Sequence, residues 1–172
     1  MTDLTDNPYP ATWQAPLRHS RYLRQLLEAR PEIADWLKEF ASKPFDLELM
    51  REFLGAPAPA TEDELKQALR RLRQRVMATL IVRDLGGQAP LAEVVETMTQ
   101  LAGITTNFAA RFIHQQLATQ FGEPLDAQGQ AQRLLIVGMG TLGGRELNVS
   151  SDVDYIFIYP EDGDTGGKKV IS

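Results

Sequence analysis

Two aspartates separated by a single residue, Asp152 and Asp154, are the residues of this chain whose types and spacing best suit chemistry. In a β-strand, alternate side chains point to the same face, so both carboxylates would project from one side of the strand. Hard carboxylate oxygens suit Mg2+ or Mn2+, and such ions commonly combine one or two carboxylates with the phosphates of a nucleotide. The pair therefore predicts a divalent-metal site of the kind that supports phosphoryl or nucleotidyl transfer.

A glycine-rich turn, Gly138-Met-Gly-Thr-Leu-Gly-Gly144, comes shortly before the aspartates. Backbone without a Cβ atom at Gly143 and Gly144 can approach a phosphate closely and direct N–H donors at it. A short helix beginning at Glu146 and Leu147 would add its N-terminal donors. We therefore expect a phosphate-binding turn beside the metal pair.

The same glycines allow a second interpretation. Gly138, Gly140 and Gly143 match the dinucleotide pattern G-x-G-x-x-G, and Glu161 stands about where a ribose-binding acid would lie. A crossover between parallel strands usually needs a dozen or more residues, whereas only residues 144–151 are available before the aspartates. An Asp-x-Asp pair next to serines is also common in ordinary turns. The metal-assisted interpretation accounts for both the glycines and the aspartates.

Two predicted strands position these residues. The apolar run of residues 134–137 is typical of a buried strand, and residues 153–159 alternate in the manner of a second strand that Pro160 ends. An acidic, glycine-rich loop follows at residues 161–167, and we expect another element to begin within residues 168–172.

The chain before residue 122 has helical periodicity. We expect short helices, one of them beginning near Pro31 and another that Asp46 caps and Gly55 ends. Thr61 and Glu64 have capping-box spacing, and the helix they begin should reach Gly86. Two further helices are predicted, one from Pro90 to Gly103 and one from about Thr106.

The helix after Thr61 also carries the densest basic cluster: Lys66, Arg70, Arg71, Arg73, Arg75 and Arg83. A phosphate or RNA surface is one interpretation. We favour a solvated helix face with an i,i+4 pair between Glu62 and Lys66, because no aromatic residues interleave the charges. Neither His19 nor His114 is assigned a function.

Composition excludes several classes. The 172 residues carry a formal charge of -5 and no cysteine, so disulfides, thiolate metal sites and cysteine nucleophiles are excluded. The acidic balance argues against a protein that coats nucleic acid, and the acidity is concentrated between residues 146 and 167, which hold no Lys or Arg. The chain shows no signal-like start and no membrane-length apolar run, so we expect a cytoplasmic protein that contacts neither membrane nor nucleic acid.

The Gly-Gly turn followed by Asp-x-Asp entering an apolar strand resembles nucleotidyltransferases related to DNA polymerase beta. More specifically, the segments Leu134-Leu-Ile-Val-Gly-Met-Gly, Leu142-Gly-Gly-Arg-Glu-Leu-Asn and Ser150-Ser-Asp-Val-Asp-Tyr-Ile-Phe resemble the bacterial glutamine synthetase adenylyltransferase/adenylyl-removing enzymes. Within that two-headed family, the motif and its preceding helical region are similar to the first, adenylyl-removing head.

The resemblance implies an α+β fold, with a helical region over residues 1–122 and the first part of a nucleotidyltransferase domain over residues 123–172. It implies that phosphate attacks the adenylyl group on a tyrosine of glutamine synthetase and releases ADP. Asp152 and Asp154 would hold Mg2+ or Mn2+, while Gly143, Gly144 and Ser151 would face phosphate or a nucleotide such as ATP or ADP. Glutamine synthetase and, through the full-length enzyme, the PII signal protein are the implied partners.

Two departures from the family pattern shape our expectations. Thr141 stands where the family usually has lysine. The family's third metal-binding carboxylate lies on a later strand, beyond Ser172, so we expect weak metal and nucleotide binding and little or no activity from the 172 residues alone. The alternative is a non-catalytic helical docking module that binds glutamine synthetase or a regulator.

Overall fold

A computed structural model describes residues 8–167 of the chain. The chain divides into two compact units, an N-terminal unit, Met1–Leu101, and a C-terminal unit, Ala102–Ser172. The sequence-based division at residue 122 stays a prediction, and the element expected within residues 168–172 lies outside the described residues. Within residues 8–167, no helix is both long enough and apolar enough to cross a membrane.

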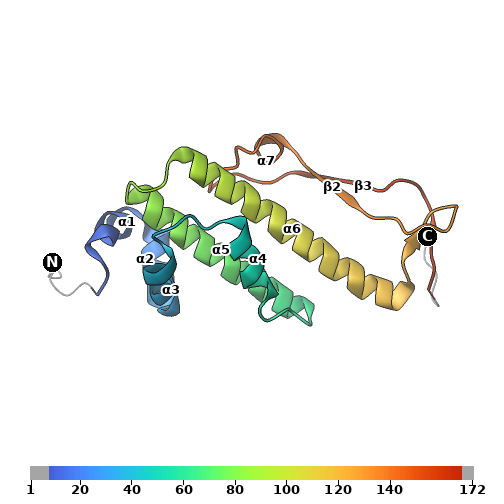
Figure 1. Cartoon of the computed structure of the whole chain (residues 1–172), viewed down its shortest axis with the longest axis horizontal. Helices are drawn as coiled ribbons and strands as arrows, with labels where there is room; N and C mark the ends of the chain where they lie inside the picture. The colour runs from blue at the N-terminus through green and yellow to red at the C-terminus, as the bar shows by residue number, and fades with distance from the viewer. Residues whose placement is uncertain (1–7, 168–172) are drawn as a thin grey trace. The chain divides into compact units, whose positions relative to one another are not determined.

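The N-terminal unit is built from helices, as the periodicity predicted. They are the 3-10 turn Ala11–Trp13 and helices α1 (Gln14–His19), α2 (Arg21–Ala29), α3 (Glu32–Phe40), α4 (Leu47–Gly55) and α5 (Glu62–Leu85), followed by the first part of α6 (Leu91–Phe121) (Figure 1). Two predicted caps are confirmed. The Asp46 carboxylate accepts the Leu49 N–H at 2.9 Å, and Thr61 and Glu64 form a capping box at the start of α5.

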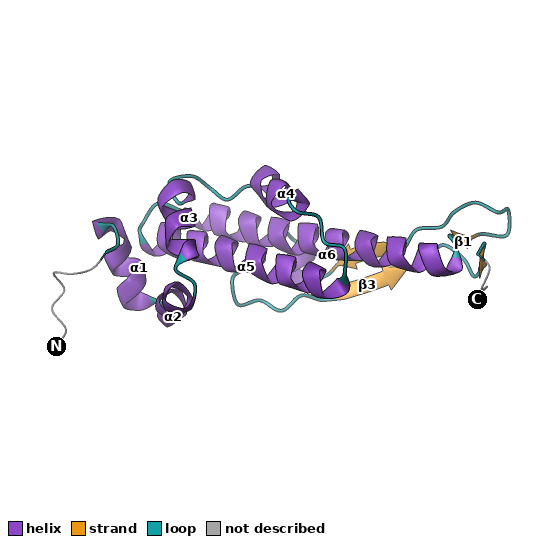
Figure 2. Ribbon diagram, turned by 90° about the horizontal axis from the view of Figure 1, so that it is seen from below, coloured by secondary structure: helices purple, strands orange, loops and turns teal. Residues whose placement is uncertain are grey.

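The core of the N-terminal unit lies between α5 and the shorter helices that surround it (Figure 2). Along α5 the predicted apolar seam is buried at Leu65, Leu72, Val76 and Leu80, whereas Leu69 is only half-buried. From the other helices, Leu23, Ile33 and Leu37 are almost completely buried. The unit therefore has an apolar core of its own.

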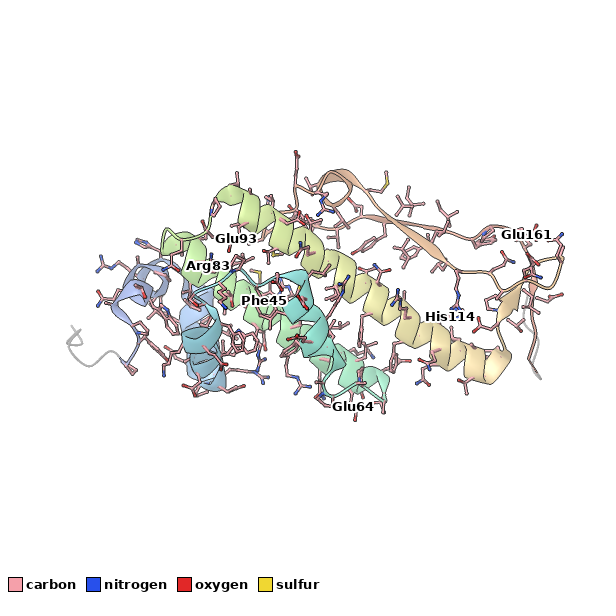
Figure 3. The ribbon with its side chains drawn as sticks, viewed as in Figure 1. Phe45, Glu64, Arg83, Glu93, His114 and Glu161 are labelled. Carbon is pink, nitrogen blue, oxygen red and sulfur yellow. The ribbon has the colours of Figure 1, made fainter. Side chains whose placement is uncertain are left out.

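Arg83 does not belong to the exposed basic cluster predicted from the sequence, because its side chain is buried. Its guanidinium forms a bidentate pair with the Glu93 carboxylate at 2.6 and 2.9 Å and also donates to the Ala41 carbonyl at 3.1 Å (Figure 3). The two side chains are only 7% and 12% exposed. The pair ties the end of α5 to the first turn of α6, so Arg83 is not available to a partner.

The two helices predicted on either side of Gly103 are wrong, because α6 runs without interruption from Leu91 to Phe121. Glycine inside a helix costs about 1 kcal/mol relative to alanine, which a long helix can absorb when no proline follows. The pattern contained Gly103 but no proline between residues 91 and 121. Gly103 is therefore an interior residue and not a helix end.

The C-terminal unit contains two small antiparallel sheets. Strand β1 (Pro124–Leu125) pairs with β4 (Asp164–Thr165), and β2 (Leu135–Gly138) pairs with β3 (Tyr155–Ile158), with the four-residue helix α7 (Gly140–Gly143) between β2 and β3 (Figure 1). The expected α+β content is confirmed, while the polymerase-beta-like fold stays a prediction.

The expectation of a buried strand at residues 134–137 is wrong for the described structure. Leu135 is 56% exposed and Val137 is 42% exposed. Within residues 8–167, β2 pairs with β3 alone, and a two-stranded ribbon cannot cover both of its faces. The second strand is also shorter than expected, so Asp152 and Asp154 precede β3 and do not lie within it.

Candidate functional site

The glycine turn after β2 is closely packed on itself. A Cβ atom on Gly143 would lie 2.6 Å from the Gly138 carbonyl oxygen, and one on Gly138 would lie 2.8 Å from the Leu142 side chain. Gly140 has φ +54°, in the left-handed region that favours glycine. The fold of the turn therefore requires these three glycines.

Gly144 differs from its neighbour, because a Cβ atom there would find its nearest neighbour, the Gly140 carbonyl oxygen, at 3.5 Å. That is ordinary van der Waals contact. The packing of the turn thus explains why residue 143 is glycine but not why residue 144 is. Close approach of a ligand to the backbone is one reason for glycine at residue 144.

The helix expected to begin at Glu146 is wrong. The helical turn is α7, which ends at Gly143, and the Glu146 N–H donates to the Thr141 carbonyl at 2.8 Å. Two buried leucines, Leu142 at 9% and Leu147 at 2% exposure, bracket the Gly-Gly pair. These apolar side chains, and not a second helix, fix the path of the loop toward the aspartates.

Asn148 organises the turn that delivers the aspartates. Its side-chain oxygen accepts from both the backbone N–H and the hydroxyl of Ser150 at 2.9 Å, and its own N–H donates to the Ser151 hydroxyl at 3.3 Å. Ser151, predicted to face phosphate, thus has a structural bond within the loop. Sequence reasoning assigned no role to Asn148, although asparagine followed by serines is a known turn signal.

Asp152 and Asp154 are both exposed. The Asp154 carbonyl accepts the Met139 N–H at 2.9 Å, which places the aspartate segment beside the glycine turn, and the next residue, Tyr155, pairs with Gly138. The Tyr155 hydroxyl lies 2.6 Å from the Thr106 hydroxyl of α6. Backbone pairing therefore brings together the two motifs that the sequence separates.

The donor chemistry of the pair fits a hard divalent cation. In the described part of the chain, neither carboxylate takes part in a hydrogen bond or ion pair with another residue, so their oxygens are open to a ligand. No group of three or more His, Cys, Asp or Glu side chains placed to hold a metal occurs within residues 8–167. A metal site at Asp152 and Asp154 would therefore have two carboxylates from the described residues and no third.

The dinucleotide interpretation is wrong. It requires parallel strands joined by a crossover helix, whereas β2 and β3 are antiparallel and α7 has four residues. Glu161, its candidate ribose-binding acid, instead accepts the Ala127 N–H at 3.0 Å and donates its own N–H to Gln132.

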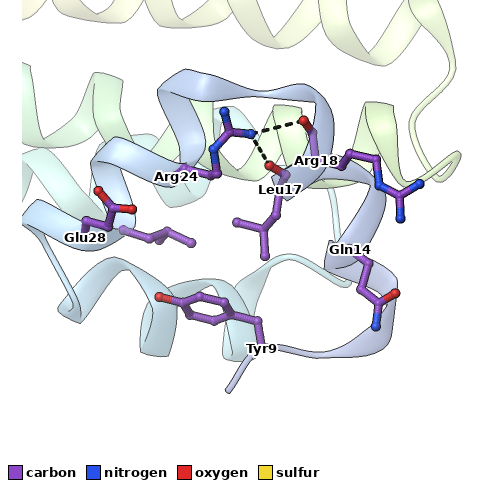
Figure 4. A pocket seen from close by; sticks show the side chains of 7 residues that line it. Tyr9, Gln14, Leu17, Arg18, Arg24 and Glu28 are labelled. Atoms are coloured by element: carbon purple, nitrogen blue, oxygen red, sulfur yellow. Dashed lines mark hydrogen bonds between the residues drawn. The ribbon is translucent and has the colours of Figure 1, made fainter. Parts of the chain in front are cut away.

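Hollows that lie away from these motifs occur in both units. In the C-terminal unit, a hollow of about 680 Å³ is lined by residues that include His114, Arg133 and Tyr159. His114 bonds the Glu123 carboxylate at 2.8 Å. In the N-terminal unit, a hollow of about 480 Å³ is lined by residues that include Leu17 and Arg24, and the Arg24 guanidinium donates to the Leu17 and Arg18 carbonyls (Figure 4). These bonds engage His114 and Arg24 with neighbouring residues.

Comparison with known proteins identifies relatives over almost the whole chain. The family model of glutamate-ammonia ligase adenylyltransferase matches residues 15–172. The chain is 47% identical over 166 residues to the bifunctional glutamine synthetase adenylyltransferase/adenylyl-removing enzyme of Aromatoleum aromaticum, covering 96% of this chain and 18% of that protein. It is 50% identical over 161 residues to the protein of the same name from Nitrosomonas europaea, covering 91% of this chain and 17% of that protein.

A third relative, the enzyme of the same name from Chromobacterium violaceum, is 49% identical over 154 residues. In each case the chain spans less than a fifth of the relative's length. The long family match and these identities agree with the motifs around the glycine turn and the aspartate pair, and the chain belongs to the glutamate-ammonia ligase adenylyltransferase family.

Proposed function

We propose that this chain contributes to the adenylyl-removing site of a bifunctional glutamine synthetase adenylyltransferase. In this proposal the site uses inorganic phosphate to release ADP from adenylylated glutamine synthetase. The single observation that carries the proposal is the backbone pairing of the glycine turn with the segment of Asp152 and Asp154. The names of the relatives supply the substrate protein and the two activities.

Asp152 and Asp154 would hold Mg2+ or Mn2+ through their open carboxylates. When bound, a divalent ion neutralises charge on phosphate oxygens and acts as a Lewis acid. The chain's own contribution is to hold two carboxylates next to a turn whose backbone can approach a phosphate. The Asn148 turn and the Met139–Asp154 backbone bond restrict where the carboxylates lie.

Gly143 and Gly144 would face the phosphate or nucleotide, with Ser151 nearby. Since packing already requires glycine at Gly143, Gly144 is the position that separates the two roles. Gly144→Ala should leave the fold unchanged yet weaken nucleotide binding if the backbone at Gly144 lies against the ligand. A Gly144→Ala variant with unaltered nucleotide affinity would remove this glycine from the proposed site.

The test of the assignment uses the full-length enzyme that contains this chain. We expect Asp152→Asn and Asp154→Asn to lower phosphate-dependent ADP release from adenylylated glutamine synthetase by about 100-fold or more, since metal-ion assistance contributes several kcal/mol. Asp162→Asn, an exposed carboxylate with no bond to another described residue, is the matched control. The assignment fails if the aspartate variants lose ATP-dependent adenylylation and keep deadenylylation.

The 172-residue chain alone should show weak metal and nucleotide binding and little turnover, because residues 8–167 contain no group of three or more His, Cys, Asp or Glu side chains placed to hold a metal. Robust phosphate-dependent ADP release by this chain would contradict that expectation. The PII protein is proposed as a partner of the full-length enzyme only.

A non-catalytic docking module is the second candidate, and the separate core of the N-terminal unit favours it. In that case the 172-residue chain would capture glutamine synthetase equally well with and without Asp152→Asn. The full-length Asp152→Asn enzyme would then keep both of its activities. Loss of deadenylylation in that variant excludes a purely docking role.

A further inference from the structure

Helix α5 carries several arginines close together in the sequence. Between Glu64 and Asp84 its sequence contains no acidic residue, and Lys66 pairs with Glu62 and Asp63 at 3.4 and 3.8 Å. Within the described residues, the next four cations form no ion pair; they are Arg70, Arg71, Arg73 and Arg75, here named the α5 arginine cluster. The predicted Glu62–Lys66 pair is confirmed, but it accounts for only one cation.

The arginines lie one helical turn apart in pairs, Arg71 with Arg75 and Arg70 with Arg73. Like charges at this spacing destabilise a helix. Arg70, Arg71 and Arg73 are exposed. A helix face that served only solubility would be more stable with acidic residues between its cations, as with Glu62 and Lys66. A cluster of one sign instead suits an oppositely charged partner.

Aromatic rings from other helices contact this cluster, which sequence spacing along α5 alone did not reveal. The Arg75 guanidinium lies 5.4 Å from the ring centre of Trp36 on α3 and 4.9 Å from that of Phe53 on α4. Stacking of this kind holds a guanidinium in place and leaves less conformational entropy to lose on binding. Arg75 is therefore a preorganised cation.

Electrostatics agree with this crowding of positive charge. Burial lowers the pKa of Arg75, Glu32 opposes that effect, and Arg71 and Arg30 lower the pKa further. Arginine nevertheless stays protonated in proteins. Burial raises the pKa of Tyr22 on α2, and the positive charge of Arg73 partly offsets that rise. The positive charges of α5 thus act on side chains of the neighbouring helices.

The rings at the cluster are not free to stack on nucleic-acid bases. Trp36 is stacked on Phe40 with ring centres 3.9 Å apart and also lies 5.5 Å from Phe45. Binding of single-stranded nucleic acid normally combines positive charge with open aromatic platforms. The chain's net charge of -5 also disfavours a long polyanion but not a local patch of carboxylates.

We propose that Arg71 and Arg75, which lie one helical turn apart on the same flank of α5, form a docking surface for an acidic segment of a protein partner, whose carboxylates their guanidinium groups pair. This surface lies within the N-terminal unit and does not depend on the metal pair. Guanidinium groups match carboxylates bidentately, which lysine cannot do. Arg75 would act as the fixed anchor and Arg71 as its neighbour.

The test measures binding of the 172-residue chain to a short fluorescein-labelled polyglutamate peptide by fluorescence anisotropy. Polyglutamine of equal length and an RNA oligonucleotide of equal charge are the comparison probes. The variant Arg71→Gln/Arg75→Gln should weaken polyglutamate binding about tenfold or more, as expected for two charge pairs. It should also flatten the dependence of affinity on salt.

The matched control is Arg51→Gln/Arg111→Gln, which removes two exposed arginines outside the cluster. It should change affinity less than about twofold. Circular dichroism melting checks that each variant is folded, and Arg71→Lys/Arg75→Lys should restore only part of the affinity. Equal losses of affinity in the cluster variant and the control variant would show that net charge alone causes the effect, and this would overturn the proposal. Tighter binding of the RNA oligonucleotide than of polyglutamate, together with loss of RNA binding in the same variant, would also overturn the proposal.

Discussion

The two units of this chain differ in how completely they bury their apolar side chains. In the N-terminal unit, α5 and its neighbours cover Leu23, Ile33, Leu72 and Val76 almost completely. In the C-terminal unit, the buried large apolar side chains within the described residues are Leu142 and Leu147, whereas Phe157 in β3 is 60% exposed. The chemistry-bearing motifs lie on the less buried unit. Stability and the candidate site are therefore supplied by different parts of the molecule.

A two-stranded ribbon with open faces is marginally stable by itself. The site's geometry thus depends on short-range devices: the glycine packing at Gly138 and Gly143, the Asn148 turn and the Met139–Asp154 bond. These contacts hold the loop in place although the strands on either side of it are exposed. Substitutions can therefore perturb the two units independently.

The largest expected effect is on the buried ion pair of the N-terminal unit. Glu93→Gln leaves the Arg83 guanidinium buried without its carboxylate and should lower the free energy of unfolding by about 3 to 5 kcal/mol. Both tryptophans, Trp13 and Trp36, lie in this unit, so urea unfolding followed by tryptophan fluorescence reports on it. Glu39→Gln, an exposed carboxylate on α3, is the control, and an equal loss there would argue against a special role for the pair.

Apolar truncations in the two units should differ. Leu72→Ala removes a fully buried side chain and should cost about 2 to 5 kcal/mol, whereas Phe157→Ala, at an exposed position, should cost about 0.5 kcal/mol or less. Thermal unfolding followed by circular dichroism compares the two variants. Similar losses would contradict the contrast in burial between the units.

Neighbouring glycines provide a sharper comparison inside the C-terminal unit. Gly143→Ala places a methyl group against the Gly138 carbonyl and should destabilise the loop by about 1 to 3 kcal/mol, whereas Gly144→Ala should stay within about 0.5 kcal/mol. Amide hydrogen exchange at β2 and β3 measures both. If Gly144→Ala opened the loop as much as Gly143→Ala, the packing explanation would be wrong.

The smallest expected effect is at the start of α5. Thr61→Ala removes the side-chain acceptor of the capping box and should lower stability by about 1 kcal/mol. Chemical denaturation measures the change, and Thr61→Ser should restore most of it because its hydroxyl can accept the same N–H. A Thr61→Ser variant as unstable as Thr61→Ala would show that the hydroxyl is not the cause.

Local signals predicted the local structure well. The caps at Asp46 and Thr61 were readable because they depend on residues three apart, and the seam along α5 followed from its period. Gly103 was misread, because a single glycine signals a helix end only when a second breaker supports it. The strand at residues 134–137 was recognised, but its burial was not, since burial depends on what packs against the strand.

Contacts between distant elements were beyond the sequence. No spacing rule indicated that Arg83 would turn inward toward Glu93, or that Trp36 and Phe53 would enclose Arg75. The antiparallel pairing of β2 with β3, which excludes a dinucleotide site, was suggested only by the short connection. At the candidate site, the sequence indicated the residues, and the structure added the Asn148 turn that holds them.

The central claim is that the carboxylates of Asp152 and Asp154 bind a divalent metal beside the glycine turn. Paramagnetic broadening of backbone NMR signals by Mn2+ tests it directly on the 172-residue chain, because it detects weak binding without requiring activity. Broadening centred on Asp152, Asp154 and the Gly143–Gly144 turn, abolished by Asp152→Asn/Asp154→Asn and retained in Asp162→Asn, is the predicted result. Broadening that persists in the double variant, or that centres on residues 161–164, would contradict the claim.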